Sequence, residues 1–571
     1  MELIRNSNII DRKFKEFFIP SILTAMSTSM ILIVDGLIVS NMLGTKEFAA
    51  VNCCLPFLQL LAMISDLLGL GGSVAISIAR GRRENRKADQ LFTTLLLLYL
   101  VSCGLLWLPQ VLAPAFFSRI LTNDPVLYPY VLDYYSVLVW CAPFAIFFQA
   151  MAYIIRAEGR PRLASFITIT ANVINVVLDV VFMGIFRMGI RGAALASVVG
   201  WGVGGIISLC SVLFGTRTLK ICFGRLGSCA WEIIKTGFPG AAGVGLVGVK
   251  TLCLNKIVTA TAGSEGMVAF SVCISALSLV SMFITGASET MMPILGIYYG
   301  ENDSLGVRMV LRKAFRILVV SSGALLLVLE AAPGLLLIPY GVTDPAEVAV
   351  ATSALRIYAL SLVGCAISYL MLYYYLTIEK QKLANLIMLI NGFLVIVPCA
   401  YVLSKLMGIN GVWWSFGITE LVTIAFIFVM ARGKVSNIYQ MEEDPAMLEV
   451  SFLGSETPGA EASMKVMQFL ENQGMEHKLV NKIGIAVEEM AENIARHSQG
   501  KGNHIDLRLK AASQGVMISF CDDGPEFDPT VYQPEEKDCY AIDNIMMLRA
   551  ISPKMEYQRV IGLNKTTIFL S

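Results

Sequence analysis

Long apolar runs dominate the first three quarters of this chain. Between Ile19 and Met430 they recur with short polar breaks, and each run of about 20 residues can cross a hydrocarbon core of about 30 Å as a helix. The pattern predicts twelve membrane spans, at residues 17–40, 50–78, 91–117, 130–154, 163–186, 192–214, 233–258, 266–292, 315–339, 351–376, 383–405 and 411–431. We therefore expect an α-helical polytopic membrane protein.

The pattern changes after Met430. Residues 433–447 form a polar linker, and residues 448–571 alternate between charged helical segments and strands such as "HIDLRL" and "GVMISF". About 125 residues suffice for one small domain. We expect a soluble α/β sandwich in this C-terminal tail.

Composition supports the same class. Of the 571 residues, 56% are hydrophobic and 15% are charged, and the mean hydropathy is +0.67. A soluble domain carries about 25% charged residues, so a wholly water-soluble protein is excluded. The thirteen cysteines are scattered, and we expect them to pack in the membrane rather than to form disulfides or a metal site. The net charge of +1 says nothing about partners, because the positions of the charges matter more than their sum; we expect no nucleic-acid partner.

Basic residues gather in alternate loops. Segments such as "RGRRENRK" and "RAEGRPR" lie on one predicted side, and "TNDPVLYP" and "PYGVTDP" lie on the other. Because cytoplasmic loops carry an excess of Lys and Arg, we expect the basic side and both termini in the cytoplasm of a cell. We therefore expect a multi-pass protein of the cell membrane whose C-terminal tail lies in the cytosol.

The twelve spans form two copies of a six-span unit. Pro20 and Pro239, Gly44 and Gly263, and "MGIRG" and "MGING" each lie 219 residues apart. An even number of spans gives both copies the same orientation, as in transporters built from parallel repeats. We predict two transmembrane bundles at residues 1–215 and 216–432, a linker at 433–447 and a cytosolic domain at 448–571. A duplicated scaffold without transport activity is the alternative.

Two carboxylates stand deep in the apolar spans of the first repeat, Asp35 and Asp179. Inserting a carboxylate at mid-bilayer costs about 2.5–3.5 kcal/mol, and such groups usually have a function. The corresponding positions of the second repeat are Leu254 and Cys399, so the fold itself requires no carboxylate there.

Two asparagines precede Asp179 at helical spacing. Asn172, Asn175 and Asp179 share one helix face and could form one hydrogen-bonded cluster with Asp35. Because all three histidines lie in the tail, carboxylates must carry any ion coupling in the membrane. A carboxylate that only packs or ends a helix is the alternative.

The second repeat has its own embedded charges. Glu289, Glu420, Lys250 and Lys256 lie within apolar spans, and any of them could line a cleft and contact substrate. Alternatively, Lys256 could extend its ammonium to a membrane interface.

Four motifs from the two predicted bundles resemble the multidrug and toxic compound extrusion (MATE) family. They are "VDGLIVSNMLG", "NVINVVLDVVF", "MGIRGAALAS" and "GASETMMPILGIYYG", and the likeness covers residues 10–432. The resemblance implies export of organic cations and other small amphipathic compounds in exchange for H⁺ or Na⁺, in contact with membrane lipid.

The resemblance also implies site residues. In the proton-coupled branch the coupling site is an Asp in the first span, an Asn and an Asp four apart in the fifth, and a hydroxyl residue in the sixth. These positions match Asp35, Asn175, Asp179 and Ser197, where Ser197 replaces the more usual Thr. Before the eighth-span proline the family often has Gln, where this chain has Glu289.

The tail resembles the GHKL ATPase fold of the anti-sigma-factor serine-kinase type. "AVEEMAENIARHS" and "CDDGPEFDP" carry the likeness, which covers residues 450–571. It implies that Asn493 coordinates Mg²⁺, that Glu489 is the catalytic general base, and that Asp522 binds the adenine amino group of ATP, with Gly524 allowing close approach.

One departure bears on activity. The family has glycines in the lid over the phosphates, and "DCYAIDNIMMLRA" has none, so the resemblance leaves open whether the tail is an enzyme. The nearest string to a P-loop, "GLNKTT", lacks the second glycine, which argues against an ATP-driven pump.

We therefore expect an ion-coupled exporter with a nucleotide-binding regulatory domain and a possible cytosolic protein partner. Two alternatives remain at this point: a flippase for a lipid-linked precursor, and a membrane sensor that controls a kinase-like domain.

Overall fold

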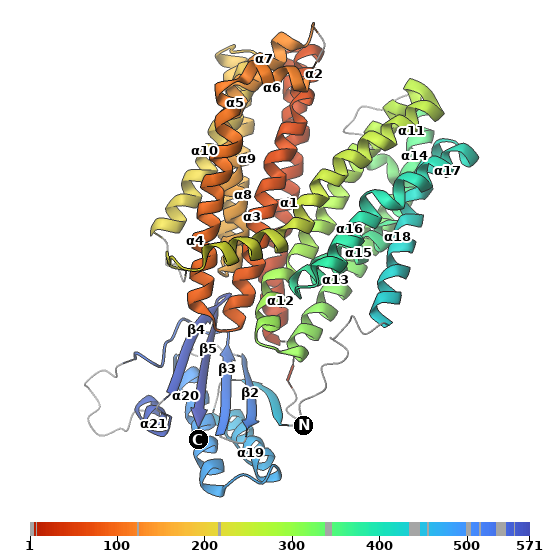
Figure 1. The fold of residues 1–571 in the computed structure, drawn as a ribbon. Coiled ribbons are helices and arrows are strands. Elements are labelled where there is room, and N and C mark those ends of the chain that lie inside the picture. The colour runs from red at the N-terminus through yellow and green to blue at the C-terminus, as the bar shows by residue number, and fades with distance from the viewer. Residues whose placement is uncertain are drawn as a thin grey trace. The chain divides into compact units, whose positions relative to one another are not determined.

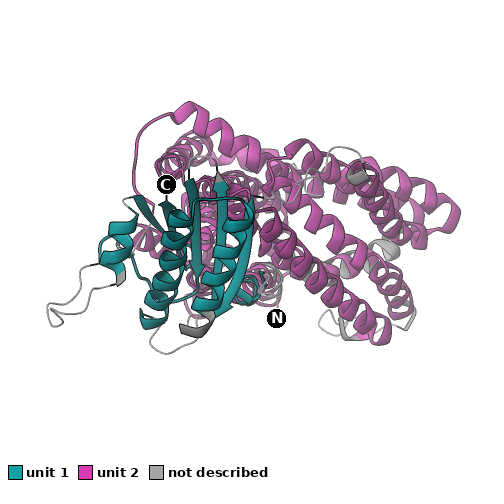
Figure 2. Ribbon diagram, turned by 90° about the horizontal axis from the view of Figure 1, so that it is seen from below, with its two compact units in different colours: residues 1–15, 437–571 teal, residues 16–436 magenta. Residues whose placement is uncertain are grey.

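The computed structural model describes residues 5–6, 8–122, 125–214, 219–336, 345–432, 446–453, 456–497, 504–512, 515–532, 544–552 and 554–570. Two compact units emerge (Figure 2). Unit 1 comprises residues 1–15 and 437–571, and unit 2 comprises residues 16–436. Unit 1 therefore contains both ends of the given chain. Residues 1–15, which the apolar pattern assigned to the first bundle, belong to the same unit as the tail. The predicted boundaries near 215 and 432–447 adjoin segments outside the described residues and stay predictions.

The first bundle of unit 2 is built from helices up to the end of the sixth predicted span (Figure 1). They are α1 (Asn8–Met42), α2 (Thr45–Cys53), α3 (Leu55–Gly81), α4 (Asn85–Ser102), η1 (Cys103–Trp107), α5 (Leu108–Leu112), α6 (Pro114–Leu121), α7 (Tyr128–Leu138), η2 (Val139–Cys141), α8 (Ala142–Ala157), α9 (Pro161–Asp179), η3 (Val180–Ile185) and α10 (Ile190–Phe214). The segments η1 and η3 are π-helical turns.

The second bundle follows the same plan. Its helices are α11 (Leu226–Glu289), α12 (Met291–Gly300), α13 (Ser304–Ala331), η4 (Pro333–Leu336), α14 (Pro345–Ala359), α15 (Leu362–Thr377), α16 (Gln381–Leu389), η6 (Ile390–Leu394), α17 (Ile396–Met407) and α18 (Ile409–Arg432). Here η6 is the π-helical turn.

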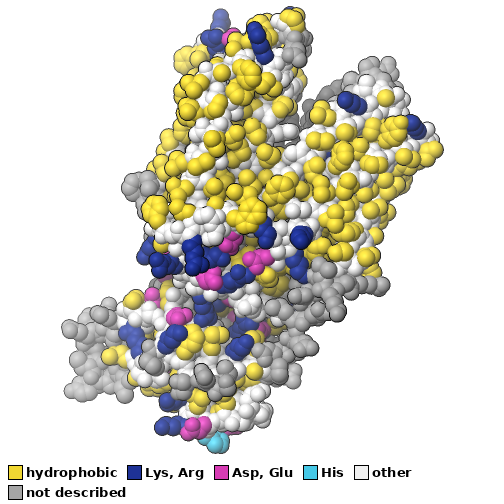
Figure 3. Space-filling view, viewed as in Figure 1, with side chains coloured by type: hydrophobic (Ala, Val, Ile, Leu, Met, Phe, Trp, Pro, Cys, Tyr) yellow, Lys and Arg dark blue, Asp and Glu magenta, His cyan; other side chains and the backbone are white. Residues whose placement is uncertain are grey.

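Most of the predicted spans have a matching helix. Among the described residues ten helices are long and apolar enough to cross a membrane, or eleven if the bent pair Val348–Ala359 and Leu362–Thr377 is one span. The predicted first span lies in α1, where the side chains of four residues are outside the described part. Figure 3 shows apolar side chains along most of the helical bundles, as a membrane-facing surface requires.

The predicted turn between the seventh and eighth spans does not interrupt the helix assignment, which continues through "ATAGSEG". The chain nevertheless reverses direction within α11. Gly237 and Glu289 both lie beside residues 66 and 67 of α3, although a straight helix between them would span about 78 Å.

A close helix crossing relates the two repeats. A Cβ added to Gly81 would lie 2.2 Å from the carbonyl oxygen of Ile297, and one added to Gly300 would lie 2.3 Å from that of Ile78. Because 78 pairs with 297 and 81 with 300 at the same offset of 219, the contact is reciprocal, as expected beside a pseudo-two-fold axis.

Unit 1 contains a five-stranded antiparallel sheet in the order β1-β2-β3-β5-β4. Its elements are β1 (Met447–Leu453), α19 (Glu456–Asn472), α20 (His477–His497), β2 (His504–Ala512), β3 (Gly515–Asp522), α21 (Asn544–Ile551), β4 (Lys554–Val560) and β5 (Leu563–Leu570). Alternate strand residues such as Val450, Leu507 and Ile518 form one core with the apolar faces of α19 and α20. The predicted sandwich is confirmed.

Candidate functional site

The two predicted coupling carboxylates meet. The carboxyl groups of Asp35 on α1 and Asp179 at the end of α9 lie within hydrogen-bonding reach of each other. Asp179 is fully buried, and neither of its oxygens has a hydrogen-bond donor among the described residues. The same holds for Oδ1 of Asp35, and the buried Tyr134 is an electrostatic neighbour of both carboxyls.

Asn175 and Ser197 complete the neighbouring turn of α9. The Asn175 side-chain amide donates to Ser197 Oγ on α10 at 2.9 Å, and both side chains are buried. Oδ1 of Asn175 has no donor among the described residues. Asn175 lies one turn before Asp179 on the same helix face, so Asn175 Oδ1 and the Asp179 carboxyl oxygens are acceptors that an H⁺ or Na⁺ could use.

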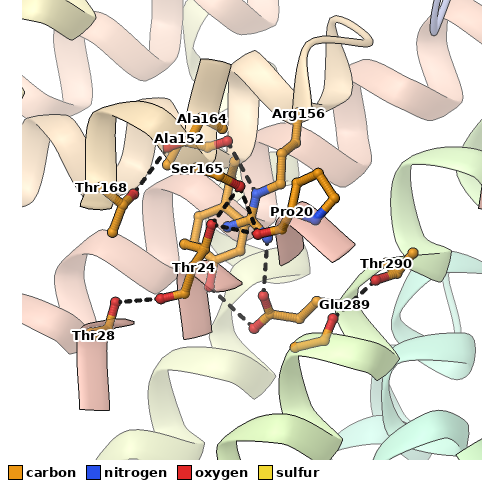
Figure 4. Close-up of polar contacts among 12 residues, drawn as sticks. Pro20, Thr24, Thr28, Ala152, Arg156, Ala164, Ser165, Thr168, Glu289 and Thr290 are labelled. Carbon is orange, nitrogen blue, oxygen red and sulfur yellow. Dashed lines mark hydrogen bonds and ion pairs between the residues drawn. The ribbon is translucent and has the colours of Figure 1, made fainter. Parts of the chain in front are cut away.

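Asn172 has a different partner from the predicted one. Its amide donates to Ser27 Oγ on α1 at 2.9 Å. One level further along, Ser165 Oγ donates to the carbonyl oxygen of Pro20 at 2.6 Å and lies 2.9 Å from Thr24 Oγ1 (Figure 4). These contacts tie α9 to α1, and Asn172 belongs to them, because it lies two turns from Asp179.

A second polar cluster joins the two bundles around Glu289. Arg156 Nη1 on α8 lies 3.3 Å from Glu289 Oε2 on α11 (Figure 4). The hydroxyls of Tyr153 and Tyr373 donate to Glu289 Oε1 at 3.4 and 3.3 Å. Tyr153 also donates to Asp66 Oδ1 on α3 at 3.2 Å.

Sequence reasoning missed most of this cluster. Counting only Asp35 and Asp179 in the first repeat was wrong, because Asp66 also lies inside an apolar span, in "AMISDLLGL". The same count of embedded charges would have found it. Its partnership with Tyr153, Arg156 and Glu289 depends on contacts between distant spans, for which one sequence gives no signal.

Glu420 lies in a third cluster, inside the second bundle. It accepts from Ser368 Oγ at 2.5 Å and from the Asn391 amide at 3.5 Å, and Asn391 belongs to the π turn η6. Lys250 is its electrostatic neighbour. The side chain of Lys256 is exposed, so the structure brings Lys250 to Glu420, and not Lys256.

The predicted nucleotide residues lie on α20 and at the end of β3. Asn493 is buried, and its amide donates to the carbonyl oxygen of Glu489 at 2.9 Å, which leaves Oδ1 as an oxygen ligand suited to Mg²⁺. His497, one turn further on, stacks on Phe527 with ring centroids 3.8 Å apart. That contact holds the end of α20 against the segment that follows Asp522.

The carboxyl of Asp522 can accept one hydrogen bond from a ligand, through Oδ2. Its Oδ1 accepts from the Gly524 N–H and from the Asn564 amide on β5, each at 2.9 Å. Both bonds use Oδ1, so Oδ2 can accept from an adenine amino group. Burial raises the pKa of the Asp522 carboxyl to about 6, against the opposing effect of Asn564 and Gly524. Asn564 was not predicted.

The phosphate lid remains a prediction. Residues 533–543, which include "DCYAID", lie outside the described residues, and α21 begins at Asn544. Among the described residues no group of three or more His, Cys, Asp or Glu side chains could hold a metal ion.

Two repeated helical bundles with buried carboxylates, joined to an ATPase-like sheet domain, define a polytopic transporter with an attached ATPase-like domain. The chain belongs to the MatE family, whose sequence model matches residues 20–181 and 246–402. The model described as histidine kinase-like ATPase domain matches residues 458–568. Both resemblances of the sequence are thereby confirmed.

Individual proteins agree with this assignment. The chain is 23% identical over 417 residues to the multidrug export protein MepA of Staphylococcus haemolyticus. The matched region covers 70% of this chain and 89% of that protein. A multidrug resistance MATE family transporter in an outward-facing conformation has a TM-score of 0.71 at 20% identity, over 75% of this chain and 96% of its own. A MATE protein in complex with MaL6 has the same TM-score and identity over 75% and 97%.

Proposed function

We propose that this protein is a secondary active antiporter that exports amphipathic organic cations in exchange for H⁺ or Na⁺. The observation that carries the proposal is the contact between Asp35 and Asp179. Two adjacent carboxyls, Asp179 fully buried and Asp35 half-buried, cannot both hold a bare negative charge, because each would be desolvated and repelled by the other. One H⁺ or Na⁺ bound between them relieves both costs.

The position of the pair gives ion binding a mechanical consequence. Asp35 lies on α1 and Asp179 at the junction of α9 and its π turn. An occupied site favours the close approach of these two helices, and an empty site favours their separation. Ion occupancy thus biases one arrangement of the first bundle over another, as ion-driven alternating access requires.

The cluster between the bundles supports a cationic substrate. It holds two carboxylates, Asp66 and Glu289, against one guanidinium, Arg156. The rings of Tyr153 and Tyr373 lie against it and can contact an apolar cation through their faces. Multidrug export by the relative from Staphylococcus haemolyticus agrees with a broad, amphipathic substrate class.

The tail acts as a nucleotide-binding regulatory domain in this proposal. Asp522 would accept from adenine, Asn493 would supply an oxygen to Mg²⁺, and Glu489, one turn earlier, would activate water. A bound ATP would supply the phosphates that Mg²⁺ needs. Because the lid sequence lacks glycines that would let the backbone approach the phosphates, we expect the tail to bind nucleotide and to turn it over slowly.

The orientation follows from the charge of the loops. The basic loops and both termini lie in the cytoplasm, and the protein resides in the cell membrane. This places the tail where ATP is abundant, and a cytosolic protein could act on it there.

Transport is tested by reconstituting the full chain in liposomes and imposing a pH or a Na⁺ gradient. We expect one of the two gradients to drive ethidium transport well above the passive leak, with ATP absent. Transport that needs ATP and ignores both gradients would overturn the antiporter.

The tail is tested by calorimetry of the full chain with ATP and Mg²⁺. We expect binding that is weakened at least tenfold in Asp522→Ala. Absence of binding at millimolar ATP would contradict the nucleotide role, and rapid hydrolysis lost in Glu489→Ala would make the tail an enzyme.

A further inference from the structure

The first residues of the chain lie on the sheet of the tail, more than 400 positions away in sequence. Arg5 Nη1 lies 3.2 Å from Glu449 Oε2, and Arg5 Nε lies 3.5 Å from Asp506 Oδ2. The backbone N–H of Asn6 donates to Ser451 Oγ at 2.9 Å, and Ser451 donates to Asp506 Oδ1 at 2.6 Å. These residues of β1 and β2 alternate with the core residues, so they occupy the sheet face opposite α19 and α20.

The contact is specific. The Arg5 side chain is 5% exposed, and Arg508 also lies 3.2 Å from Glu449, so two guanidiniums balance the two carboxylates Glu449 and Asp506. A buried charge is tolerated only with partners of opposite sign and good geometry. Removing Arg5 would take one guanidinium away from Glu449 and Asp506.

The segment also reaches the end of the sheet that carries the nucleotide residues. Arg12 forms an ion pair with Asp523, whose side chain is 1% exposed and also accepts from the backbone N–H of His504 at 3.1 Å. A Cβ added to Gly562 in the β4–β5 turn would lie 3.1 Å from Lys13 Nζ. Asp523 stands between Asp522 and Gly524, so a change at the adenine position acts on its neighbour in the same turn.

Arg12 belongs to the helix that carries the coupling carboxylate. Helix α1 runs without a break from Asn8 to Met42 and includes both Arg12 and Asp35. The two residues are 23 positions apart, about 35 Å along a helix that rises 1.5 Å per residue. Pro20 lies between the two residues and removes one helix hydrogen bond, so displacement of the first turn can reach Asp35 as a change in the bend at Pro20.

We propose that the outer face of the tail sheet is the receptor for the chain's own N-terminal segment, and that nucleotide bound beside Asp523 regulates transport by changing its hold on α1. This inference rests on the proposed nucleotide role of the tail. Regulation requires that the tail bind the start of α1 with different affinity when nucleotide is bound and when it is absent. Equal affinity would not shift the balance between transporter conformations.

The test compares the wild-type full chain with Arg12→Ala, and with Lys554→Ala as the control. Lys554 is an exposed cation of the same unit, on β4, with Glu556 and Phe569 as its neighbours. Three quantities are measured for each: ATP affinity with Mg²⁺ by calorimetry, hydrogen exchange of the amides of residues 8–15, and ethidium transport with and without ATP and Mg²⁺.

In the wild type and in Lys554→Ala, ATP and Mg²⁺ should change both the exchange of residues 8–15 and the transport rate at least threefold. Arg12→Ala should bind ATP within about threefold of the wild type, and ATP should no longer change either quantity. ATP binding to the wild type with no effect on residues 8–15, or an undiminished ATP effect in Arg12→Ala, overturns the link alone. Absence of ATP binding to the wild type overturns the nucleotide role and the link with it.

Arg5→Ala tests the receptor surface separately and without nucleotide. Exchange of residues 8–15 should rise at least tenfold, because the unbalanced Glu449 and Asp506 no longer hold the segment. Unchanged exchange in Arg5→Ala overturns the receptor surface.

Discussion

Asp179 occupies the last position of α9, and the π turn η3 follows it at once. A π turn widens the backbone locally and is frequent at functional sites. The residue is buried, its oxygens have no donor among the described residues, and its neighbour is the carboxyl of Asp35. At the residue scale, the proposed function assigns to this pair the change of charge that accompanies ion binding.

Neutral replacements of the pair should uncouple transport. We expect Asp179→Asn and Asp35→Asn each to reduce gradient-driven ethidium transport at least tenfold, since an amide cannot take up or release the ion. The matched control is Asp133→Asn, which removes an exposed partner of Arg191. Wild-type rates in both site variants, with the control also normal, would remove the pair from the coupling role.

Glu289 gives a prediction about substrates. Glu289→Gln leaves Asp66 and Arg156 to neutralise each other, so the cluster between the bundles loses its net negative charge. Binding of cationic dyes should weaken several-fold more than binding of neutral ones. Equal losses for the two kinds of dye would assign Glu289 to packing of the bundles.

Ionisation of the Asp522 carboxyl should lower the free energy of unfolding of the tail. Burial raises its pKa from 3.8 to about 6, so as the pH rises through this window the unfolded chain loses its proton first and the folded tail is destabilised. Since each pKa unit corresponds to about 1.4 kcal/mol, the cost above pH 6 is about 2–3 kcal/mol.

Asp522→Asn removes this charge and keeps an oxygen that can accept from Gly524 and Asn564. Near pH 7.5 the variant should protect the β3 amides from hydrogen exchange at least tenfold better than wild type while binding ATP more weakly. The gain should shrink as the pH falls toward 4. A destabilised variant at pH 7.5 would contradict the account of Asp522.

At the scale of elements, α3 and α12 cross at a close contact between the two bundles. The crossing depends on Gly81 and Gly300, because a Cβ on either would meet a backbone carbonyl of the other helix at 2.2 or 2.3 Å. Backbone atoms cannot move aside as side chains do, so a Cβ at either glycine would force the two bundles apart at this reciprocal contact.

Gly81→Ala and Gly300→Ala should each destabilise the membrane part by about 1–3 kcal/mol through overpacking. Gly323→Ala on α13 is the control, because a Cβ there meets nothing within 4 Å. All six tryptophans lie between residues 107 and 414, so thermal unfolding followed by tryptophan fluorescence reports on the membrane part alone. A lowered midpoint in Gly323→Ala equal to that of the other two would contradict the crossing.

The sequence predicted these elements where the signal is local or periodic. Apolar runs gave the spans, the offset of 219 gave the repeat, and the spacing of Asn175 and Asp179 placed them on one face of α9. The partner of Asn172, the cluster around Asp66 and the pairing of Arg12 with Asp523 depend on packing between distant segments. No pattern within a single segment specifies such contacts.

At the scale of the whole molecule, three charged centres have separate tasks in this account. The Asp35–Asp179 pair takes the ion, the cluster around Glu289 lies between the bundles and meets the substrate, and the tail senses nucleotide. Helix α1 carries both Asp35 and Arg12, so it belongs to the ion site and to the hold of the tail on the N-terminal segment.

The most direct test of the central claim is substrate-induced ion release from the purified full chain in detergent. Ethidium is added in weakly buffered solution, and released H⁺ is followed with a pH indicator or released Na⁺ with a Na⁺ electrode. The account predicts that the wild type and Asp133→Asn release one of these ions on binding substrate, and that Asp179→Asn binds ethidium but releases neither. Undiminished release from Asp179→Asn would contradict it.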